Sequence, residues 1–310
     1  MIVTVTPNPA LDLTWQVTQI THGATHRADT GAARAGGKGL NVARVAHAQG
    51  ADVIAVTTAG GPTGAEFADE LSASGIPHVL VPVAAATRRS IALVDEALGD
   101  TTIVNERGVN PSADEWQALQ GAAAAAVAGA RVLVISGSLP PGAPADALAR
   151  LIRMGRDAGA AVIADTSGPA LLQAADAGAS VLKPNEAELV EATGLDDPLA
   201  GARELLRRGT GLVLLSRGAD GMLAVTADRT LQAALPAVLA GNPTGAGDAA
   251  VAACAVLMDA GIHDPAEILR RATAWSAAAV LMPLAGEIHP SWTDLEHDLA
   301  ITTSDPKELS

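Results

Sequence analysis

The sequence predicts an α/β protein, a doubly wound α/β/α sandwich that carries a small additional β-sheet. From Ser112 onward, short apolar strands alternate with helices of about 10–15 residues, a rhythm typical of parallel βαβ units. Two earlier stretches, at about 12–35 and 86–108, contain short, partly polar strands outside this rhythm. We therefore expect a single domain over residues 1–310, in which the strands of these two stretches form a lid.

Composition narrows the class of protein before any motif is considered. The chain has 20 basic and 34 acidic residues, a formal net charge of −14, and 49% apolar residues. An acidic chain without basic runs argues against nucleic acid as a partner. The single Cys254 excludes a disulfide framework, the opening residues form a strand rather than a signal peptide, and no apolar run is long enough to span a membrane. We expect a cytoplasmic protein without a membrane partner.

The N-terminal part of the chain supplies core strands, the lid strands and the first helices. Residues 2–6 alternate as a short strand that Pro7 and Pro9 stop, so that Asp12 follows near its carboxyl end. Between residues 13 and 35 we expect two strands outside the main sheet, one of them carrying Arg27. The other elements expected here are a helix opened by residues 35–41 and ending near 50, a strand at 53–57, a helix at 60–74, a strand at 78–83 and a hairpin of 90–94 with 101–104.

The second half of the chain is more regular. The expected elements are helices at 112–128, 144–158, 169–177, 197–208, 245–259, 265–283 and 291–300, strands at 131–135, 161–165, 180–182, 211–215 and 222–225, and a frayed tail from Thr302. Polar motifs directly follow the strands of this series. Because the carboxyl ends of parallel strands meet at one edge of a sheet, these loops are predicted to form one site.

The segment Asn242-Pro-Thr-Gly-Ala-Gly-Asp248 is predicted to bind an anion at a helix start. Gly245 and Gly247 let the backbone approach a phosphate, and the free N–H groups of the first turn, together with the helix dipole, attract negative charge. Asp248 is unsuited to bind a phosphate but suited to take a proton from an attacking hydroxyl. The alternative is an ordinary Gly-rich turn with an acid beside the helix dipole.

A second Gly-rich helix start contains one of only three lysines in the chain. Lys38 lies in Ala35-Gly-Gly-Lys-Gly-Leu-Asn41, which lacks the spacing of a Walker A loop. The glycines bring the backbone close to a ligand, Asn41 can donate to and accept from sugar hydroxyls, and Lys38 can supply positive charge.

Three further motifs have both a functional and a structural interpretation. In Lys183-Pro-Asn-Glu-Ala-Glu188, Asn185 and Glu188 share a helix face and could hold a hydrated Mg²⁺, or could form a helix cap. The segment from Ser216 to Gly221 could hold a nucleotide or be an ordinary hairpin turn. Arg88, beside Arg89, could be an exposed edge charge or a bidentate ligand of a phosphate.

Other classes of site fit the sequence less well. The seven histidines lack metal-ligand spacing, and Ser136-Gly-Ser138 lacks the nucleophile elbow of a serine hydrolase. Residues 245–250 match the loose dinucleotide pattern G-x-G-x-x-[GA], but the segment from Gln232 to Gly241 contains Pro236 and is a poor strand, which argues against a dehydrogenase. The alternative from another class is a non-catalytic sugar-phosphate sensor on the same fold.

Five motifs resemble those of the PfkB/ribokinase-type carbohydrate kinases, and within them the branch of 1-phosphofructokinase and tagatose-6-phosphate kinase. They occur in family order and span nearly the whole chain: Thr6-Pro-Asn-Pro-Ala-Leu-Asp12, Gly36-Gly-Lys-Gly-Leu-Asn-Val-Ala-Arg44, Ser136-Gly-Ser-Leu-Pro140, Lys183-Pro-Asn-x-x-Glu188 and Asn242-Pro-Thr-Gly-Ala-Gly-Asp248. The resemblance implies a ribokinase-like fold with a small β-sheet lid and ATP-dependent phosphorylation of a sugar or sugar-phosphate hydroxyl. For phosphoryl transfer, a protein mainly has to position the reacting groups, neutralise negative charge on the phosphates and supply one proton acceptor.

The resemblance also implies a role for each candidate residue, with Asp248 as the catalytic base and ATP and Mg²⁺ as the cofactors. The other implied roles are an anion hole at Gly245, Ala246 and Gly247, sugar binding by Asp12, Gly37, Lys38 and Asn41, binding of the substrate phosphate by Arg27, Arg88 and Ser138, Mg²⁺ binding by Asn185 and Glu188, and nucleotide binding by Lys183, Asn185, Ser216, Gly218 and Gly221.

Two departures from the family pattern bear on this assignment. Asn242-Pro243 stands where the wider family often has Asp-Thr, although the branch named above tolerates Asn-Pro. Asn105-Glu-Arg-Gly108 stands where relatives have Asn-Glu-Pro-Gly. Arg107 therefore adds a cation near the lid. The resemblance implies conversion of fructose 1-phosphate into fructose 1,6-bisphosphate, with tagatose 6-phosphate and fructose 6-phosphate as alternative substrates. Family members commonly dimerise through lid strands, so we expect a homodimer.

Overall fold

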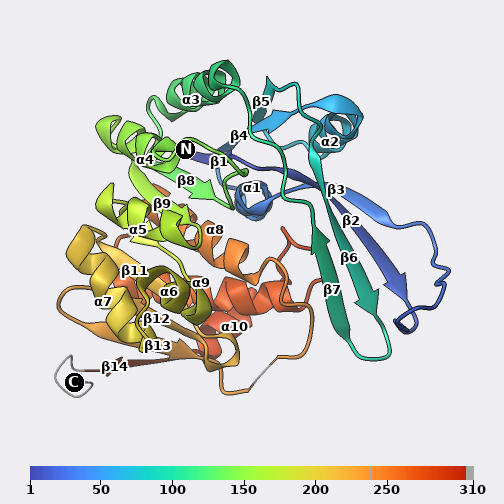
Figure 1. The fold of residues 1–310 in the computed structure, drawn as a ribbon. Helices are drawn as coiled ribbons and strands as arrows, with labels where there is room; N and C mark the ends of the chain where they lie inside the picture. The colour runs from blue at the N-terminus through green and yellow to red at the C-terminus, as the bar shows by residue number, and fades with distance from the viewer. Residues whose placement is uncertain (238, 305–310) are drawn as a thin grey trace.

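A ten-stranded mixed β-sheet forms the centre of the computed structural model, which describes residues 1–237 and 239–304 (Figure 1). Its strand order is β14-β13-β12-β11-β10-β9-β8-β1-β4-β5. The strands from β11 to β5 pair in parallel, and β12, β13 and β14 add an antiparallel edge. The strand bounds are β1 (Ile2–Thr6), β4 (Val53–Ala59), β5 (His78–Pro82), β8 (Val132–Ser136), β9 (Ala161–Asp165), β10 (Val181–Leu182), β11 (Leu212–Ser216), β12 (Met222–Val225), β13 (Thr230–Ala234) and β14 (Ala300–Ser304).

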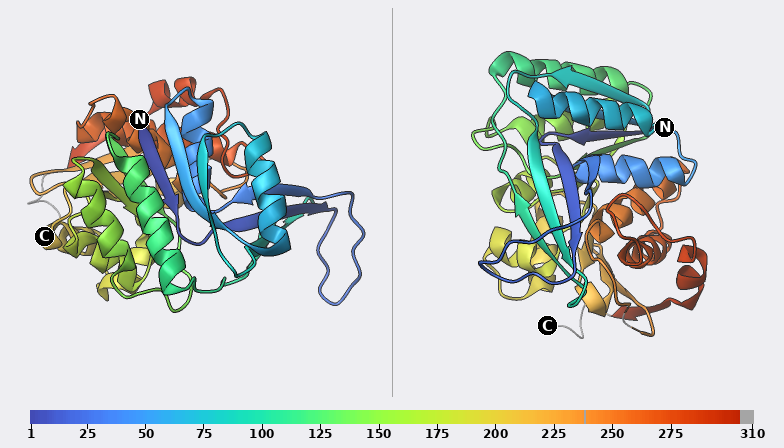
Figure 2. Two further views of the ribbon diagram at one scale, coloured as in Figure 1. Left: turned by 90° about the horizontal axis from the view of Figure 1, so that it is seen from above. Right: turned by 90° about the vertical axis from the view of Figure 1, so that its right-hand side faces the viewer.

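Helices cover both faces of this sheet, and each face has its own apolar core (Figures 1 and 2). One layer consists of α1 (Lys38–Ala48), α2 (Gly61–Ala73), α8 (Ala246–Asp259), α9 (Pro265–Val280) and α10 (Trp292–Asp298). The opposite layer consists of α3 (Ala113–Val127), α4 (Ala147–Asp157), α5 (Pro169–Asp176), α6 (Glu186–Thr193) and α7 (Pro198–Arg208). The predicted α/β/α sandwich is thus confirmed. Among the described residues, no helix is long and apolar enough to cross a membrane.

Local sequence explains why these layers form. The residues of β1 are all buried and largely β-branched, as expected of a strand covered on both faces. Helix α3 begins with a capping box in which the Ser112 hydroxyl accepts from the Glu115 amide, and the Glu115 carboxylate accepts from the Ser112 amide. In α8, a run of buried small residues lets the helix pack closely against both α1 and α9.

The strand order creates a crevice at the carboxyl ends of the central strands. Strand β1 lies between β4 and β8, so the chain first builds the sheet in one direction and then returns to extend it in the other. Open α/β sheets bind ligands where the order reverses in this way, because the two flanking loops diverge to opposite faces. The loops that follow β8, β9, β10 and β11, all running parallel to β1, open at the same edge.

A second sheet, called the small sheet below, stands beside this edge (Figures 1 and 2). Its order is β3-β2-β6-β7, with β2 (Ala10–Val17), β3 (Ala32–Gly36), β6 (Arg88–Asp95) and β7 (Asp100–Asn105). These strands come from the two stretches that the sequence singled out. Asp12, expected in the loop after β1, instead lies within β2, because pairing with both β3 and β6 draws that segment into the small sheet.

Three local predictions were wrong. Arg27 was expected on a strand, but residues 18–31 contain none, and Arg27 is exposed in this long connection between β2 and β3. The segment from Gln232 to Gly241, expected to be a poor strand, contributes residues 232–234 to β13, which ends before Pro236 is reached. The tail was expected to fray from Thr302, but residues 300–304 pair as β14 with the free edge of β13. The remainder of the predicted tail, 305–310, lies outside the described residues.

Candidate active site

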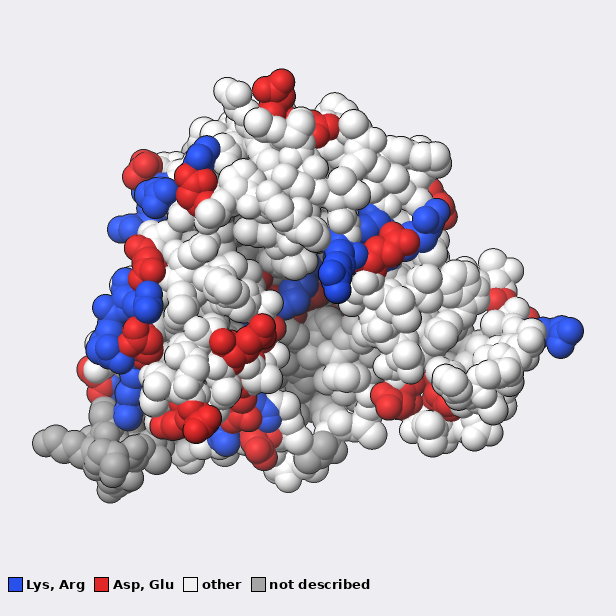
Figure 3. Space-filling view, in the orientation of Figure 1, with Lys and Arg blue, Asp and Glu red and all other residues white. Residues whose placement is uncertain are grey.

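A cavity of about 1090 Å³ lies between the carboxyl edge of the central sheet and the small sheet. Figure 3 shows the hollow between these two parts, with Lys and Arg side chains at its edge. Every residue proposed from the sequence lines this cavity except Arg27: Asp12, Gly37, Lys38, Asn41, Arg88, Ser138, Lys183, Asn185, Glu188, Ser216, Gly218, Gly221, Gly245, Ala246, Gly247 and Asp248. Tertiary structure therefore gathers motifs that are up to about 230 residues apart in the chain.

The start of α8 faces the cavity with unpaired backbone amides. Its N-cap, Gly245, has φ +87° and no side-chain cap, and a Cβ there would lie 2.8 Å from the Cα of Ala285. The Ala246 amide donates to the Pro243 carbonyl, but the amides of Gly247 and Asp248 have no acceptor among the described residues. Together with the helix dipole, these free N–H groups make an anion-binding site.

Lys183 adds positive charge at the same point. A Cβ built on Gly247 would lie 3.1 Å from the Lys183 Nζ, so the amine sits directly over the first turn of α8. The side chain of Lys183 is buried, and it reaches this point from the loop that follows β10. An ammonium group and free backbone amides thus converge on one place, as a phosphoryl group requires.

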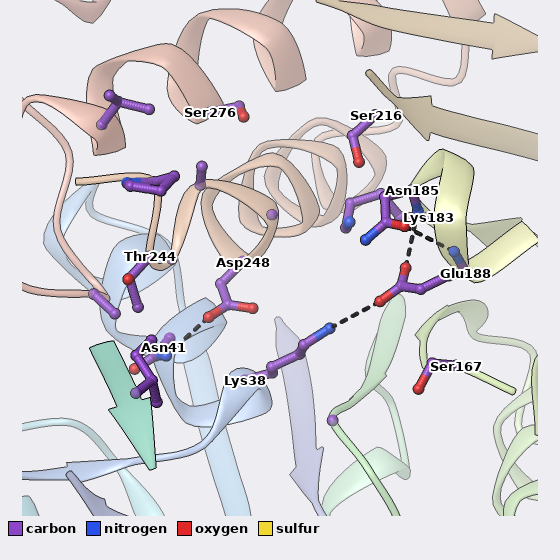
Figure 4. A pocket seen from close by; sticks show the side chains of 18 of the residues that line it. Lys38, Asn41, Ser167, Lys183, Asn185, Glu188, Ser216, Thr244, Asp248 and Ser276 are labelled. Atoms are coloured by element: carbon purple, nitrogen blue, oxygen red, sulfur yellow. Dashed lines mark hydrogen bonds and ion pairs between the residues drawn. The ribbon is translucent and has the colours of Figure 1, made fainter. Parts of the chain in front are cut away.

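The start of α1 is built in a similar way. Its N-cap, Gly37, has φ +106° and no side-chain cap, while Gly36 has no room for a Cβ because one would lie 1.9 Å from Oδ2 of Asp12. The glycines therefore allow Asp12 of β2 to approach the helix start. In the first turn of α1, Lys38 projects into the cavity, and Asn41 is buried beside α8 (Figure 4).

Asp248 lies in the first turn of α8 and is only 5% exposed. Its Oδ2 accepts a hydrogen bond of 2.8 Å from the Nδ2 of Asn41 (Figure 4). Burial raises the pKa of Asp248 to about 7, against the opposing effect of the Lys38 ammonium; the negative charge of Asp165 raises it further. A carboxyl group that titrates near neutral pH is suited to accept a proton during a reaction.

A buried cluster of charges lies beside Asp248. Asp165, at the end of β9, is completely buried; its Oδ2 lies 3.2 Å from the Lys38 Nζ and its Oδ1 lies 3.6 Å from the Lys183 Nζ. The Ser136 hydroxyl donates to the same Oδ2 over 3.0 Å. Burial alone would raise the pKa of Asp165, but the two ammonium groups outweigh burial and hold this pKa below its usual range. Asp165 is therefore an anion in the folded protein.

Asn185 and Glu188 form the helix cap that was the structural alternative for this pair. The Asn185 Oδ1 accepts from the Glu188 amide over 2.8 Å, and the Glu188 Oε2 accepts from the Asn185 amide over 2.9 Å. The cap leaves the other carboxylate oxygen, Oε1, facing the cavity 3.9 Å from the Lys38 Nζ (Figure 4). A cap and a ligand role are therefore compatible for Glu188.

The small sheet supplies the other end of the cavity. Burial raises the pKa of Asp12 to about 6, although the nearby Arg88 guanidinium lowers it. Arg88 donates through Nε and Nη2 to the Asn8 carbonyl and through Nη1 to the Glu106 carbonyl. These bonds use three of the five guanidinium N–H groups, so donors remain for an anion in the cavity. Arg107 also lines this end.

The Asn8 side chain connects three loops at this end of the cavity. Its Nδ2 lies 3.1 Å from the Arg107 carbonyl and 3.2 Å from the Ser138 Oγ, which joins the loops that follow β1, β7 and β8. The carboxylate of Glu106 accepts from the Arg89 amide over 2.7 Å, which joins the end of β7 to β6.

The opposite end of the cavity is lined by the turn after β11 and by apolar residues. Ser216 ends the strand, and Gly221 has φ +83° with no room for a Cβ, which would lie 2.1 Å from the Ala233 carbonyl oxygen. Leu235 and Val280 provide an apolar lining nearby. A flat, apolar group with polar edges fits this combination.

Sequence reasoning missed two side chains that belong to the site, Asp165 and Asn8. Each follows a signal that was available, because each lies at or just beyond the carboxyl end of a parallel strand. Arg27 is the opposite case, since it does not line the cavity and its side chain is exposed.

Comparison with known protein families defines the class of this protein. Residues 6–292 match the pfkB family carbohydrate kinase. Since this match covers most of the chain, the protein belongs to the pfkB family of carbohydrate kinases, which are phosphotransferases that use ATP. The resemblance found in the motifs is thereby confirmed.

Relatives within the family point to phosphofructokinases. The chain is 36% identical to a 1-phosphofructokinase of Xanthomonas campestris pv. campestris, over 88% of this chain and 89% of the relative. It is also 36% identical to a 1-phosphofructokinase of Rhodobacter capsulatus, over 93% and 92%, and to an ATP-dependent 6-phosphofructokinase isozyme 2 of Mycobacterium tuberculosis, over 91% and 84%.

Solved structures show the same fold. Phosphofructokinase-2 from Escherichia coli, in complex with potassium, superimposes with a TM-score of 0.88 at 30% identity, over 96% of this chain and 98% of that one. A possible 1-phosphofructokinase from Thermotoga maritima superimposes with a TM-score of 0.90 at 21% identity, over 98% and 100%. The predicted ribokinase-like fold class is confirmed.

Proposed function

We propose that this protein is a 1-phosphofructokinase, which transfers the γ-phosphoryl group of ATP to fructose 1-phosphate and releases fructose 1,6-bisphosphate and ADP. One observation carries the proposal: a buried Asp248 with a pKa near 7 lies in the first turn of α8, whose free amides and neighbouring Lys183 face the same cavity. The similarity to 1-phosphofructokinases over most of the chain supports the choice of substrate.

In the proposed reaction, Asp248 is the base. A sugar hydroxyl oxygen attacks the γ-phosphorus, the bond between this phosphorus and the bridging oxygen of ADP breaks, and the hydroxyl proton passes to the Asp248 carboxylate. The free amides of Gly247 and Asp248, within the anion hole expected at Gly245, Ala246 and Gly247, and the ammonium of Lys183 stabilise the negative charge on the transferring group. Asn41 orients the carboxylate through its 2.8 Å hydrogen bond.

Mg²⁺ fits the proposed site through few protein ligands. Among the described residues, no group of three or more His, Cys, Asp or Glu side chains could hold a metal. Mg²⁺ needs no such group, since it keeps several waters and binds one or two carboxylates together with substrate phosphates. We propose Glu188, through the Oε1 that the helix cap leaves free, as its main ligand, with Asn185 beside it. When bound, Mg²⁺ would neutralise charge on the phosphates.

The phosphate of the sugar is proposed to bind at the small sheet. Arg88 retains free N–H donors there, Arg107 adds a second guanidinium, and Ser138 contributes a hydroxyl. Asp12 lies between this end and α1, where its carboxylate can accept hydrogen bonds from sugar hydroxyls. Lys38, Asn41 and the Gly37 amide are the other proposed partners of the sugar, and each can donate to its oxygens. ATP then occupies the remaining end, lined by Ser216, Gly218 and Gly221.

An ADP-release assay over a panel of acceptors tests the proposal. The panel contains fructose 1-phosphate, fructose 6-phosphate, tagatose 6-phosphate, free ketohexoses and nucleosides, each with ATP and Mg²⁺. The proposal expects kcat/KM to be highest for fructose 1-phosphate. A higher value for either 6-phosphate would reassign the substrate, and tight sugar-phosphate binding without turnover would favour a sensor.

We further propose that the small sheet is a lid and that two copies of the chain dimerise through it. Cross-strand pairing places Leu13, Ile91 and Val104 together on the face opposite the cavity-lining Asp12 and Ser90. This outer face is apolar and partly exposed, with Val104 56% exposed. A tetrameric inhibited form is known for the phosphofructokinase-2 of Escherichia coli, which supports self-association as a property of such proteins.

Dimerisation would also give Arg27 a role. The connection between β2 and β3, residues 18–31, extends beyond the end of the small sheet (Figure 2), and Arg27 within it is exposed and does not line the cavity of its own chain. The proposed phosphate-binding role of Arg27 therefore requires the cavity of a second copy, reached across the outer faces of the two small sheets.

A further inference from the structure

Asp165 is the buried charge of the cavity that the proposed reaction does not use. It ends β9, has no exposed surface, and lies between two lysines that come from separate elements: Lys38 from the first turn of α1 and Lys183 from the loop after β10. The distances are 3.2 Å from its Oδ2 to the Lys38 Nζ and 3.6 Å from its Oδ1 to the Lys183 Nζ.

Lys38 has three carboxylates within its electrostatic reach. Its ammonium lies 3.2 Å from Asp165 and 3.9 Å from Glu188, and it is close enough to Asp248 for each to affect the ionisation of the other. Figure 4 shows Lys38 between Asp248 on one side and Glu188 on the other. The direction of the Lys38 side chain therefore depends on the competing attraction of these three carboxylates for its ammonium group. Asp165 is the nearest of the three.

A direct ion pair between Lys38 and Asp248 would impair catalysis. A carboxylate that is paired with an ammonium group is a weaker base, because the pair favours the charged, unprotonated form. The lysine would also be turned away from the phosphoryl group that it has to face. Something must hold Lys38 apart from the base.

We propose that Asp165 is a positioning residue for phosphoryl transfer, which holds Lys38 and Lys183 on the phosphate side of the cavity and keeps Lys38 from pairing with Asp248. This inference rests on the proposed role of Asp248 as base. Ser136 fixes the carboxylate by donating to its Oδ2 over 3.0 Å. Since Asp165 is buried behind the two lysines and does not line the cavity, it acts through them and not on the substrate.

The proposal predicts the direction in which the base titrates. The groups that face Asp248 are Lys38 and Asn41 of α1, Asp165 of β9 and Lys183 of the loop after β10. Asp165 raises the pKa of Asp248, so removing its charge lowers that pKa, and a released Lys38 that moves towards Asp248 lowers it again. Both effects move the acid limb of the pH–rate profile towards lower pH.

The test is the pH dependence of kcat/KM for fructose 1-phosphate in Asp165→Asn, between about pH 5 and about pH 9. We expect the acid limb to move down by about one pH unit or more and kcat on its high-pH plateau to fall by about 10²-fold. The matched control is Ser136→Ala, which loses a hydrogen bond to the same oxygen without a change of charge and should keep the wild-type limb.

The outcomes separate this inference from the proposed function. If Asp165→Asn lowers kcat but leaves the acid limb of the pH–rate profile in place, the role of Asp165 is merely structural and the inference is overturned. An acid limb displaced to higher pH would also overturn it, as would no change in either kcat or the acid limb. A wild-type enzyme that releases no ADP with any sugar phosphate would overturn the proposed function as well.

Asp165→Asn removes the negative partner of two lysines, and the uncompensated charge can prevent folding. A second pair of variants keeps the inference testable in that case. Lys38→Met with Asp165→Asn removes opposite charges together, and its reference is Lys38→Met alone. The acid limb of the double variant should lie below that of the single one, since the charge of Asp165 is gone. Coincident limbs would overturn the inference.

Discussion

At the residue scale, the site depends on a few side chains placed where water cannot fully solvate them. Asp248 is the main example, because burial raises its pKa while Asn41 and Lys38 favour its ionised form. The balance leaves a carboxyl group that can be ionised before the reaction and protonated after it, near neutral pH. The same burial has a cost in stability, since a charged group has been taken out of water.

Asp248→Ala is expected to lower kcat by about 10²- to 10⁴-fold and to leave the affinity for ATP nearly unchanged, because a base acts mainly in the transition state. A coupled ADP-release assay gives kcat, and calorimetric titration with ATP gives the affinity. Asp259→Ala, at the other end of α8, is the control: it removes an ion pair with the N-terminus and should leave kcat intact. Near-normal turnover in Asp248→Ala would contradict its assignment as base.

Asp248→Asn should stabilise the fold, and more so at high pH. The folded-state pKa of Asp248, about 7, lies above its ordinary value of 3.8, so its favourable contribution is present at low pH and is lost as the pH rises through about 7. The neutral amide avoids this loss, which is at most about 4 kcal/mol. Urea unfolding at several pH values measures it. A gain that does not grow between about pH 4 and about pH 7 would argue against the raised pKa.

At the scale of elements, two helix starts and one sheet edge define the cavity. Both α1 and α8 begin at a glycine with positive φ and without a side-chain cap, and amides in their first turns stay free for ligands. The loops after β8, β9, β10 and β11 bring the charged side chains to these amides. Single residues matter here through the backbone geometry that they permit.

Gly247→Ala is expected to lower kcat by about 10²-fold, because its Cβ would lie 3.1 Å from the Lys183 Nζ and displace the amine from the phosphoryl group. Steady-state kinetics with ATP varied gives the effect. The control is Gly121→Ala in α3, which meets no atom within 4 Å and should raise stability by about 0.5–1 kcal/mol without affecting kcat. Equal kinetics in the two variants would refute a site over α8.

Arg107→Ala should raise KM for the sugar phosphate by about tenfold or more and change KM for an unphosphorylated ketose little, because Arg107 lines the cavity where the sugar phosphate is proposed to bind. The neighbouring Arg89 is exposed and does not line the cavity, so Arg89→Ala serves as the matched control. If both variants shift KM alike, or if both acceptors are affected alike, Arg107 has no specific role.

At the scale of the whole molecule, the small sheet has two different faces. The face towards the cavity carries polar residues such as Asp12 and Ser90, whereas the opposite face carries Leu13, Ile91 and Val104. An apolar face that remains partly exposed favours association with a second surface of the same kind. Catalysis and assembly are therefore proposed to share one structural element.

Val104→Asp should convert a dimer into a monomer and raise KM for the sugar phosphate, since the monomer lacks Arg27 of a second copy. Sedimentation equilibrium measures the association, and ADP release measures KM. Leu195→Asp, which introduces the same charge at another exposed apolar position, is the control and should stay dimeric. A wild-type protein that is monomeric at micromolar concentration, with full activity, would contradict the proposed dimer.

Much of the site could be predicted because its residues occur in short motifs with local physical meaning. Gly245, Gly247 and Asp248 describe a helix start that binds an anion, and strand-end positions mark Lys183 and Ser138 as neighbours of one edge. Asp165 was missed since a lone acid at a strand end has no motif around it. Arg27 was placed on a strand because alternation in a polar stretch does not separate a strand from an extended connection.

The sequence by itself determined the alternation of strands and helices, the two glycine-rich helix starts and the polar loops at the strand ends, because all of these depend on neighbours in the chain. Only the tertiary structure decided which charges meet. Lys38, Asp165, Lys183 and Asp248 come from four separate elements, and their distances and burial set the ionisation of Asp248. Electrostatic energies depend on distance and on access to water, and neither quantity can be obtained from local sequence.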